Sequence, residues 1–209
     1  MDSKAATFLH QPAKSNGDGF ILTHGAGGNA NAPLLVALAD ALSDAGFTVV
    51  CYNLPFRQQR PFGPPRPAGA EQDRDGLKSE VAAMRELVGG RVFLGGHSYG
   101  GRQSSMLCAE QPGLVEGLLL LSYPLHPPGK PDQLRTRHLP DLKTPTLFVS
   151  GTIDPFGSIE ELNAALKLIP AKTKLLMVQQ AGHDLGFKGK SKREELPMVI
   201  LKTFEELIS

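Results

Sequence analysis

The 209-residue sequence has no tryptophan and almost no net charge. Its 22 lysine and arginine residues nearly balance 21 acidic residues, so charge gives no reason to expect nucleic acid or an anionic membrane as a partner. No apolar run approaches the roughly 18 residues of a membrane span, and the first residues lack the apolar core of a signal peptide. We therefore expect a soluble protein with no membrane partner.

Cysteine is equally scarce. Cys51 and Cys108 lie in apolar segments without CxxC spacing, which favours buried free thiols over a disulfide or a metal site. The histidines show no spacing typical of metal ligands, so we expect no metal and no cofactor. A reducing cytoplasm is the simplest compartment for such a chain.

What the sequence does contain is an alternation of strand-like and helix-like segments. Apolar or β-branched runs predict strands at 7–9, 20–23, 47–51, 92–94, 117–122, 146–150 and 174–178. Helical periodicity and capping signals predict helices at about 32–45, 72–88, 103–110, 158–168 and 195–208. Several strands are apolar throughout, which is typical of strands buried on both faces of a parallel sheet. The sequence therefore predicts a single α/β domain over residues 1–209, with a doubly wound, mainly parallel sheet.

Four local expectations follow. The strands at 7–9 and 20–23 could form a hairpin, and Asn31 can cap the first helix. Residues 54–67 carry five prolines, which predicts a stiff surface loop without regular structure. Residues 123–143 are irregular and few, so any cap over the active site must be small and the site shallow.

A G-x-S-x-G pattern lies between the strand at 92–94 and the following helix. Gly96, Ser98 and Gly100 meet this pattern in the strand, turn and helix context that a nucleophilic serine needs. Glycine on either side removes collisions at a strained turn, and the amide of Tyr99 then points towards an incoming carbonyl oxygen. Because the chain has 23 glycines, the pattern alone could also arise by chance.

A serine nucleophile needs a base and a group that orients the base. Asp154 follows the strand at 146–150 and His183 follows the strand at 174–178, so both leave strands at the edge where Ser98 lies. Asp184 is the competing carboxylate, but its place beside His183 in sequence is poor for reaching the ring. Asp154 could instead stabilise its own turn, and His183 could be a surface histidine.

At these residues the sequence resembles the α/β-hydrolase superfamily across nearly the whole chain. The resemblance rests on His24-Gly25, the G-x-S-x-G pattern, Asp154 and Gly182-His183, in the chain order Ser98, Asp154, His183. It implies that Ser98 is the nucleophile, His183 the general base and then acid, and Asp154 the orienting carboxylate.

Residues 24–29 form a glycine-rich loop that can turn a backbone amide inward. We expect the amides of Ala26 and Tyr99 to form the oxyanion hole, with Gly27 as the alternative to Ala26. His24 is more suited to fixing this loop by hydrogen bonding than to proton transfer. His97 is expected to pack beside the serine turn.

A narrower resemblance rests on residues 56–61 (FRQQRP), 123–130 (YPLHPPGK) and 151–157 (GTIDPFG). These look like a small branch of hydrolase-like proteins that includes the testis-expressed protein thirty and the hydrolase-like domain of a regulatory subunit of the nonspecific-lethal complex. That branch implies the fold but not a substrate. Arg57, Arg60 and His126 in these segments could rim the site and hold an anionic substrate, or the arginines could be solvated or pair with local acids.

Two functions follow from this constellation. The favoured one is a serine hydrolase that cleaves a carboxylic ester or related small acyl substrate through an acyl-enzyme intermediate, as a carboxylesterase or thioesterase does. The alternative is a hydrolase-like protein-interaction module that retains these residues with little or no catalysis. The acyl group, the leaving group and the oligomeric state are open at this stage.

Overall fold

The seven strands form one sheet in the computed structural model, which describes residues 7–187 and 193–209. The strands are β1 (Thr7–His10), β2 (Gly19–Thr23), β3 (Thr48–Tyr52), β4 (Val92–His97), β5 (Gly117–Leu121), β6 (Thr146–Gly151) and β7 (Thr173–Val178). Their order is β1-β3-β2-β4-β5-β6-β7, and every neighbouring pair is parallel except β1 with β3. The predicted mainly parallel sheet is thus confirmed.

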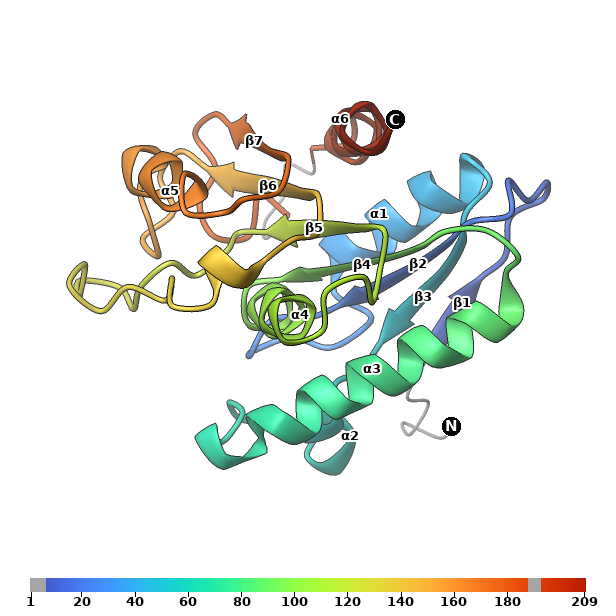
Figure 1. Cartoon of the computed structure of the whole chain (residues 1–209), viewed down its shortest axis with the longest axis horizontal. Coiled ribbons are helices and arrows are strands. Elements are labelled where there is room, and N and C mark those ends of the chain that lie inside the picture. Colours follow the sequence, from blue (N-terminus) through green and yellow to red (C-terminus); the bar gives the residue numbers. More distant parts are fainter. Residues whose placement is uncertain (1–6, 188–192) are drawn as a thin grey trace.

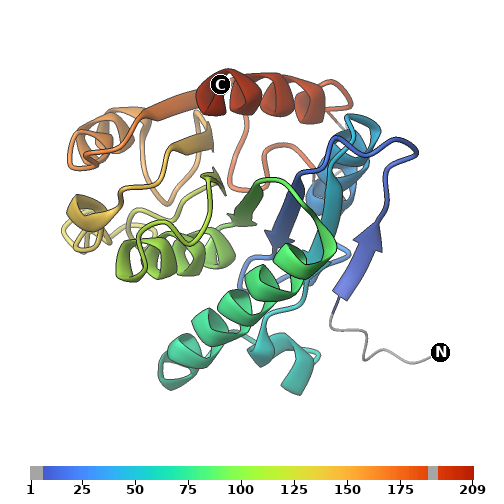
Figure 2. The same ribbon diagram turned by 45° about the vertical axis from the view of Figure 1, so that its right-hand side comes forward.

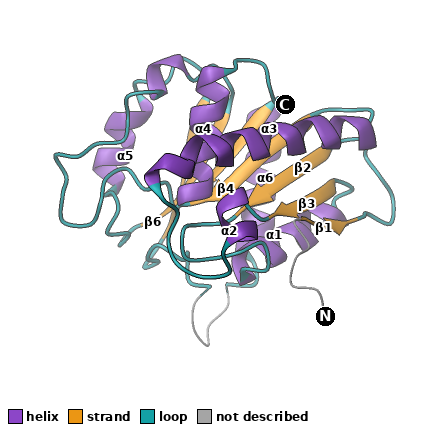
Figure 3. Cartoon of the chain, turned by 90° about the horizontal axis from the view of Figure 1, so that it is seen from below, coloured by secondary structure: helices purple, strands orange, loops and turns teal. Residues whose placement is uncertain are grey.

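Helices cover both faces of this sheet (Figure 1). On one face lie α1 (Pro33–Asp44) and α6 (Leu196–Ile208), whose leucines pack with Phe20, Phe93 and other strand residues. The other face carries α3 (Ala70–Leu87), α4 (Tyr99–Glu110) and α5 (Ile159–Leu166). Figure 2 shows the dark red α6 and the green α3 on opposite sides of the sheet, and Figure 3 shows α3 and α4 crossing the strands.

The expected hairpin between the first two strands is wrong. β1 pairs antiparallel with β3, in the register Thr7 with Tyr52, and makes an edge strand. β2 is central instead, with β3 and β4 parallel on its two sides. Both edges of β2 are therefore occupied, and β1 can join only the outer edge of β3.

Two expectations near the prolines are also corrected. Asn31 does not cap α1, because the N-cap residue is Ala32 and Pro33 opens the helix. Residues 54–67 are not wholly irregular, since α2 (Pro55–Gln59) lies within them and a short 3-10 turn starts at Pro67. Proline is tolerated at the first position of a helix, where its missing N–H has no partner to lose, so Pro55 starts α2 rather than preventing it.

Other local predictions are confirmed. Ser158 and Glu161 form the capping box that starts α5, with both reciprocal hydrogen bonds present. Cys51 and Cys108 are buried free thiols. Among the described helices, none is long and apolar enough to cross a bilayer.

The connection from β5 to β6 determines how much covers the site. Within residues 122–145 the regular structure is the three-residue 3-10 turn η2 (Leu139–Asp141), so any cap over the site is small, as expected. The carboxyl ends of β4, β6 and β7 lie at the same edge because these strands are parallel. Ser98, Asp154 and His183 follow these three ends.

Candidate active site

Ser98 occupies a strained turn between β4 and α4. Its backbone has φ 51° and ψ −114°, a region that residues other than glycine rarely adopt. A Cβ at Gly96 would lie 2.6 Å from the amide nitrogen of Gly101, and a Cβ at Gly100 would lie 2.6 Å from the carbonyl oxygen of His24. Only glycine fits at these two positions, so the pattern around Ser98 follows from close backbone packing.

The side chains of Ser98, His183 and Asp154 form one hydrogen-bonded chain. Ser98 Oγ lies 2.8 Å from His183 Nε2. His183 Nδ1 lies 2.9 Å and 3.1 Å from the two carboxylate oxygens of Asp154, whose side chain is 1% exposed. With the proton on Nδ1 donated to Asp154, Nε2 is free to accept the proton of the Ser98 hydroxyl.

Neighbouring side chains fix the imidazole ring of His183. Phe156 stacks on this ring with centroids 4.1 Å apart, and its backbone amide donates a 2.9 Å hydrogen bond to Asp154 Oδ1. His97 Nε2 donates to the carbonyl oxygen of His183 over 2.7 Å. The sequence reasoning missed both roles, although Phe156 lies two residues after the predicted carboxylate and could have been noticed there.

Asp184 lies in a different environment from Asp154. One of its carboxylate oxygens accepts a hydrogen bond of 3.1 Å from the amide of Gly186, and the residue lines the cavity beside Ser98. The carboxylate that bonds the ring of His183 is therefore the one that follows β6, as the strand ends predicted.

The glycine-rich loop after β2 faces Ser98. In the described part of the chain, the amides of Ala26 and Tyr99 donate to no protein acceptor, which leaves both available to a ligand. Gly27, the alternative donor, lines the cavity at Ser98 together with Ala26. The phenol of Tyr99 donates to Asp73 over 2.7 Å and thereby fixes the start of α4.

His24 holds this loop through two hydrogen bonds of its ring. Its side chain is fully buried, Nδ1 donates to the carbonyl oxygen of Gly25 over 2.9 Å, and Nε2 accepts from the amide of Leu54 over 3.1 Å. Burial is the main reason that the pKa of His24 falls to about 4. A neutral ring with both nitrogens engaged in this way holds the loop and does not face the cavity lined by Ser98.

Arg57 also holds this loop through hydrogen bonds of its guanidinium. Its Nε donates to the carbonyl oxygen of Gly28 over 2.8 Å, and its Nη2 donates to that of Ala26 over 2.8 Å. Further bonds run to the carbonyl oxygens of Arg60 and Gly63. The sequence interpretation offered solvent or local acids as the alternative to substrate, but the partners are backbone carbonyls, so this guanidinium organises loops.

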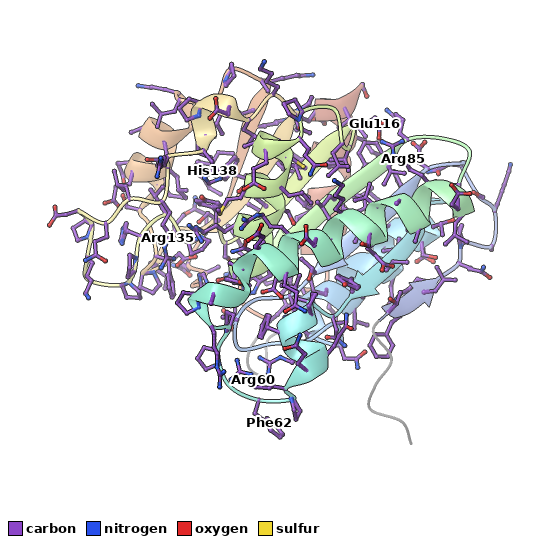
Figure 4. All side chains as sticks on the ribbon, turned by 60° about the horizontal axis from the view of Figure 1, so that its bottom comes forward. Arg60, Phe62, Arg85, Glu116, Arg135 and His138 are labelled. Carbon is purple, nitrogen blue, oxygen red and sulfur yellow. The ribbon has the colours of Figure 1, made fainter. Side chains whose placement is uncertain are left out.

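Arg60 and His126 do not line either of the two cavities that contain Ser98. Arg60 donates to the carbonyl oxygen of Pro64 and lies with Phe62 at the tip of the loop after α2 (Figure 4). His126 Nε2 lies 3.3 Å from Glu161 Oε2, and Nδ1 lies 2.8 Å from a backbone carbonyl oxygen. The structure therefore does not bring these two residues to Ser98.

Two cavities flank Ser98 and share Ala26, Ser98 and Phe156. The first, of about 290 Å³, is walled by His183 and by apolar side chains that include Leu34 and Phe187. The second, of about 500 Å³, lies against α4 and the segment 123–143. A substrate carbonyl at Ser98 would thus have room on both sides. In the described residues, no group of three or more histidine, cysteine, aspartate or glutamate side chains is placed to hold a metal.

Solved structures share this fold over almost their whole length. An α/β serine hydrolase without lid from Xanthomonas campestris superposes with a TM-score of 0.76 at 18% identity, covering 96% of this chain and 88% of that one. A serine hydrolase homologue from Coxiella burnetii gives a TM-score of 0.73 at 20% identity, with 94% and 90% covered. Dienelactone hydrolase from Anabaena variabilis gives 0.72 at 21% identity, with 95% and 88% covered.

The sequence itself matches a family described as an alpha/beta hydrolase domain. The match extends over residues 16–206 and so includes the serine turn, both loops that carry Asp154 and His183, helices α1 to α5 and most of α6. The chain belongs to the α/β-hydrolase family.

Proposed function

We propose that this protein is a serine hydrolase that cleaves a carboxylic ester or related acyl compound through an acyl-enzyme intermediate. The observation that carries the proposal is the unbroken chain from Ser98 Oγ through His183 to the buried carboxylate of Asp154, with contacts of 2.8 and 2.9 Å. The family membership supports a hydrolase, and the open amides at Ala26 and Tyr99 support acyl transfer.

The first half of the reaction forms the acyl-enzyme. Ser98 Oγ attacks the carbonyl carbon as its proton passes to His183 Nε2, and the negative charge on the carbonyl oxygen is stabilised by the two amides. The tetrahedral intermediate collapses when the bond to the leaving oxygen or sulfur breaks, and His183 returns the proton to that atom. Asp154 stays ionised and stabilises the imidazolium.

Water completes the cycle. His183 takes a proton from water, the hydroxide adds to the acyl carbon, and the second tetrahedral intermediate releases the carboxylic acid while Ser98 recovers its proton from His183. The fold without a lid supports a small or extended substrate with direct access from solvent.

The proposal also includes the branch of the family, the cellular location and the domain organisation. Residues 56–61, 123–130 and 151–157 favour the branch that includes the testis-expressed protein thirty and the nonspecific-lethal complex subunit. The two buried thiols favour a cytoplasmic location, and the single sheet favours one domain over residues 1–209. Each of these is part of the proposal.

A fluorophosphonate probe tests the proposal directly, because it reacts with an activated serine. We expect labelling of the wild-type protein between about pH 6 and 9 and no labelling of Ser98→Ala. Ser79→Ala removes an exposed hydroxyl on α3 and should leave labelling unchanged. Absence of labelling in folded wild-type protein would reject the enzyme and favour an interaction module.

A further inference from the structure

The second cavity beside Ser98 is lined by three arginines and by no acidic residue of the described chain. Arg102 comes from α4, Arg135 from the segment 123–143 and Arg66 from the loop before α3. Ser98 itself forms part of the same wall. The cavity therefore places positive charge next to the proposed nucleophile, although the whole sequence carries a net charge of only +1.

Arg102 has no counter-ion in the part of the chain that the structure describes. Its Nε is buried and has no hydrogen-bond partner there. Some arginines of this protein do have an acidic partner. Arg85 lies 3.0 Å from Glu116, and Arg91 lies 2.8 Å from Asp18. Figure 4 shows Arg85 and Glu116 side by side. A buried donor without an acceptor is unfavourable unless a ligand supplies one, so Arg102 indicates a missing acceptor.

Gln103 adds a second buried donor without a partner. This residue is fully buried and lines the same cavity. Its Oε1 accepts a hydrogen bond of 3.1 Å from Arg74 Nη1, which fixes the orientation of the amide. Its Nε2 has no acceptor among the described residues.

Arg135 lies close enough to Arg102 for their charges to interact. Burial and, after it, the positive charge of Arg102 lower the pKa of the Arg135 guanidinium. Among the described residues, the guanidinium donates one hydrogen bond, of 3.2 Å, from Nη1 to the carbonyl oxygen of Pro124. Figure 4 shows Arg135 on the segment beside α4. Two like charges held close together beside a cavity favour an anion in that cavity.

We infer that this cavity binds a carboxylate at the far end of the acyl group, so that the enzyme prefers half-esters or half-thioesters of dicarboxylic acids. The inference rests on the proposed serine hydrolase function. A carboxylate offers planar acceptors that match guanidinium groups, and each oxygen can accept more than one hydrogen bond. Arg102, Arg135 and Gln103 supply donors of this kind around one cavity.

The position of His183 decides which part of the substrate carries the charge. His183 returns a proton to the leaving group, so the leaving group must lie on the side of Ser98 where this ring lies. His183 lines the apolar cavity and does not line the cavity of the arginines. The apolar cavity therefore takes the alcohol or thiol, and the arginine cavity takes the acyl chain.

Helical geometry sets the length of that chain. Arg102 lies four residues after Ser98 on α4, which is about 6 Å along the helix axis. An acyl chain of roughly five or six carbons spans such a distance, so glutarate and adipate are suitable acyl groups.

The test compares two naphthyl esters, one with a free terminal carboxylate and one in which a methyl group caps that carboxylate. 2-Naphthyl hydrogen adipate carries a terminal carboxylate, and 2-naphthyl methyl adipate has the same chain with that carboxylate capped. From naphthol release we expect kcat/KM to be roughly 10- to 100-fold higher for the anionic ester, with a ratio that falls as salt is added. Arg102→Gln and Arg135→Gln should each lower this ratio about tenfold.

Arg85→Gln is the matched control, because Arg85 pairs with Glu116, lines neither cavity at Ser98 and should leave the ratio unchanged. If the wild type hydrolyses both esters equally, the carboxylate site is refuted while the hydrolase stands. If neither ester is hydrolysed, calorimetric titration of Ser98→Ala with monomethyl adipate decides: binding that Arg102→Gln abolishes supports the site, and no binding refutes it.

Discussion

Acid should weaken this protein through His24, the buried histidine at the start of the glycine-rich loop after β2. Its ring is fully buried, and Nε2 must stay unprotonated to accept the amide proton of Leu54. Protonation would remove this acceptor and place a charge near Arg57 and His97, both of which disfavour it electrostatically. The loop that holds Ala26 would thus be loosened as the pH falls.

The size of the effect follows from the pKa of His24 in the two states. An unfolded chain protonates this residue near 6.5, whereas the folded protein does so near 4. Between these values the unfolded state binds more protons, so the stability present above pH 6.5 is lost as the pH falls towards 4. At pH 5 the loss from His24 alone is about 2 kcal/mol relative to pH 7.

Urea denaturation monitored by circular dichroism at pH 7 and pH 5 measures this loss. His24→Gln should destabilise the protein at pH 7 but shrink the difference between the two pH values by about 2 kcal/mol. His138→Gln is the matched comparison, because burial also lowers the pKa of His138 to about 4. His138 lies at a different place, where its Nε2 is 2.8 Å from Ser105 Oγ on α4. An undiminished pH dependence in His24→Gln would refute the assignment.

Two further predictions concern the same corner of the fold. Gly100→Ala would place a methyl group 2.6 Å from the carbonyl oxygen of His24 and 2.7 Å from a methyl of Thr23, so we expect a loss of about 1–3 kcal/mol in urea denaturation and a lower kcat. Arg57→Met removes the donors that hold Ala26, so kcat should fall about tenfold or more with a smaller change in KM. If Arg57→Met changes KM alone, Arg57 contacts substrate instead of positioning the loop.

Much of the fold could be predicted because strands and helices here have strong local signals. The helices predicted at 158–168 and 195–208 start within a residue of α5 and α6, because Ser158 and Glu161 cap the first and Pro197 lies in the first turn of the second. Pairing between strands is a different matter, since it depends on which edge is free. Nothing in residues 7–10 distinguishes pairing with β2 from pairing with β3.

The candidate site shows the same division. Ser98, Asp154 and His183 could be brought together from sequence because each follows a parallel strand, and parallel strands end at one edge. Arg57 also follows a strand, yet its long side chain turns back to carbonyl oxygens of the loop after β2. The position of the guanidinium at the end of such a long, flexible side chain is set by the acceptors around it, and strand order does not reveal those acceptors.

Composition also conceals the charge beside Ser98. A near-zero net charge argues against polyanionic partners, because binding these requires excess positive charge over a wide surface. It does not argue against a small anion, which responds to the few charges within hydrogen-bond reach. Acidic side chains elsewhere in the chain can balance the total, as Glu116 and Asp18 do beside their arginines, while leaving Arg102 Nε without a partner among the described residues. The relevant quantity for substrate choice is therefore the local pairing of each arginine, and that is a property of the fold.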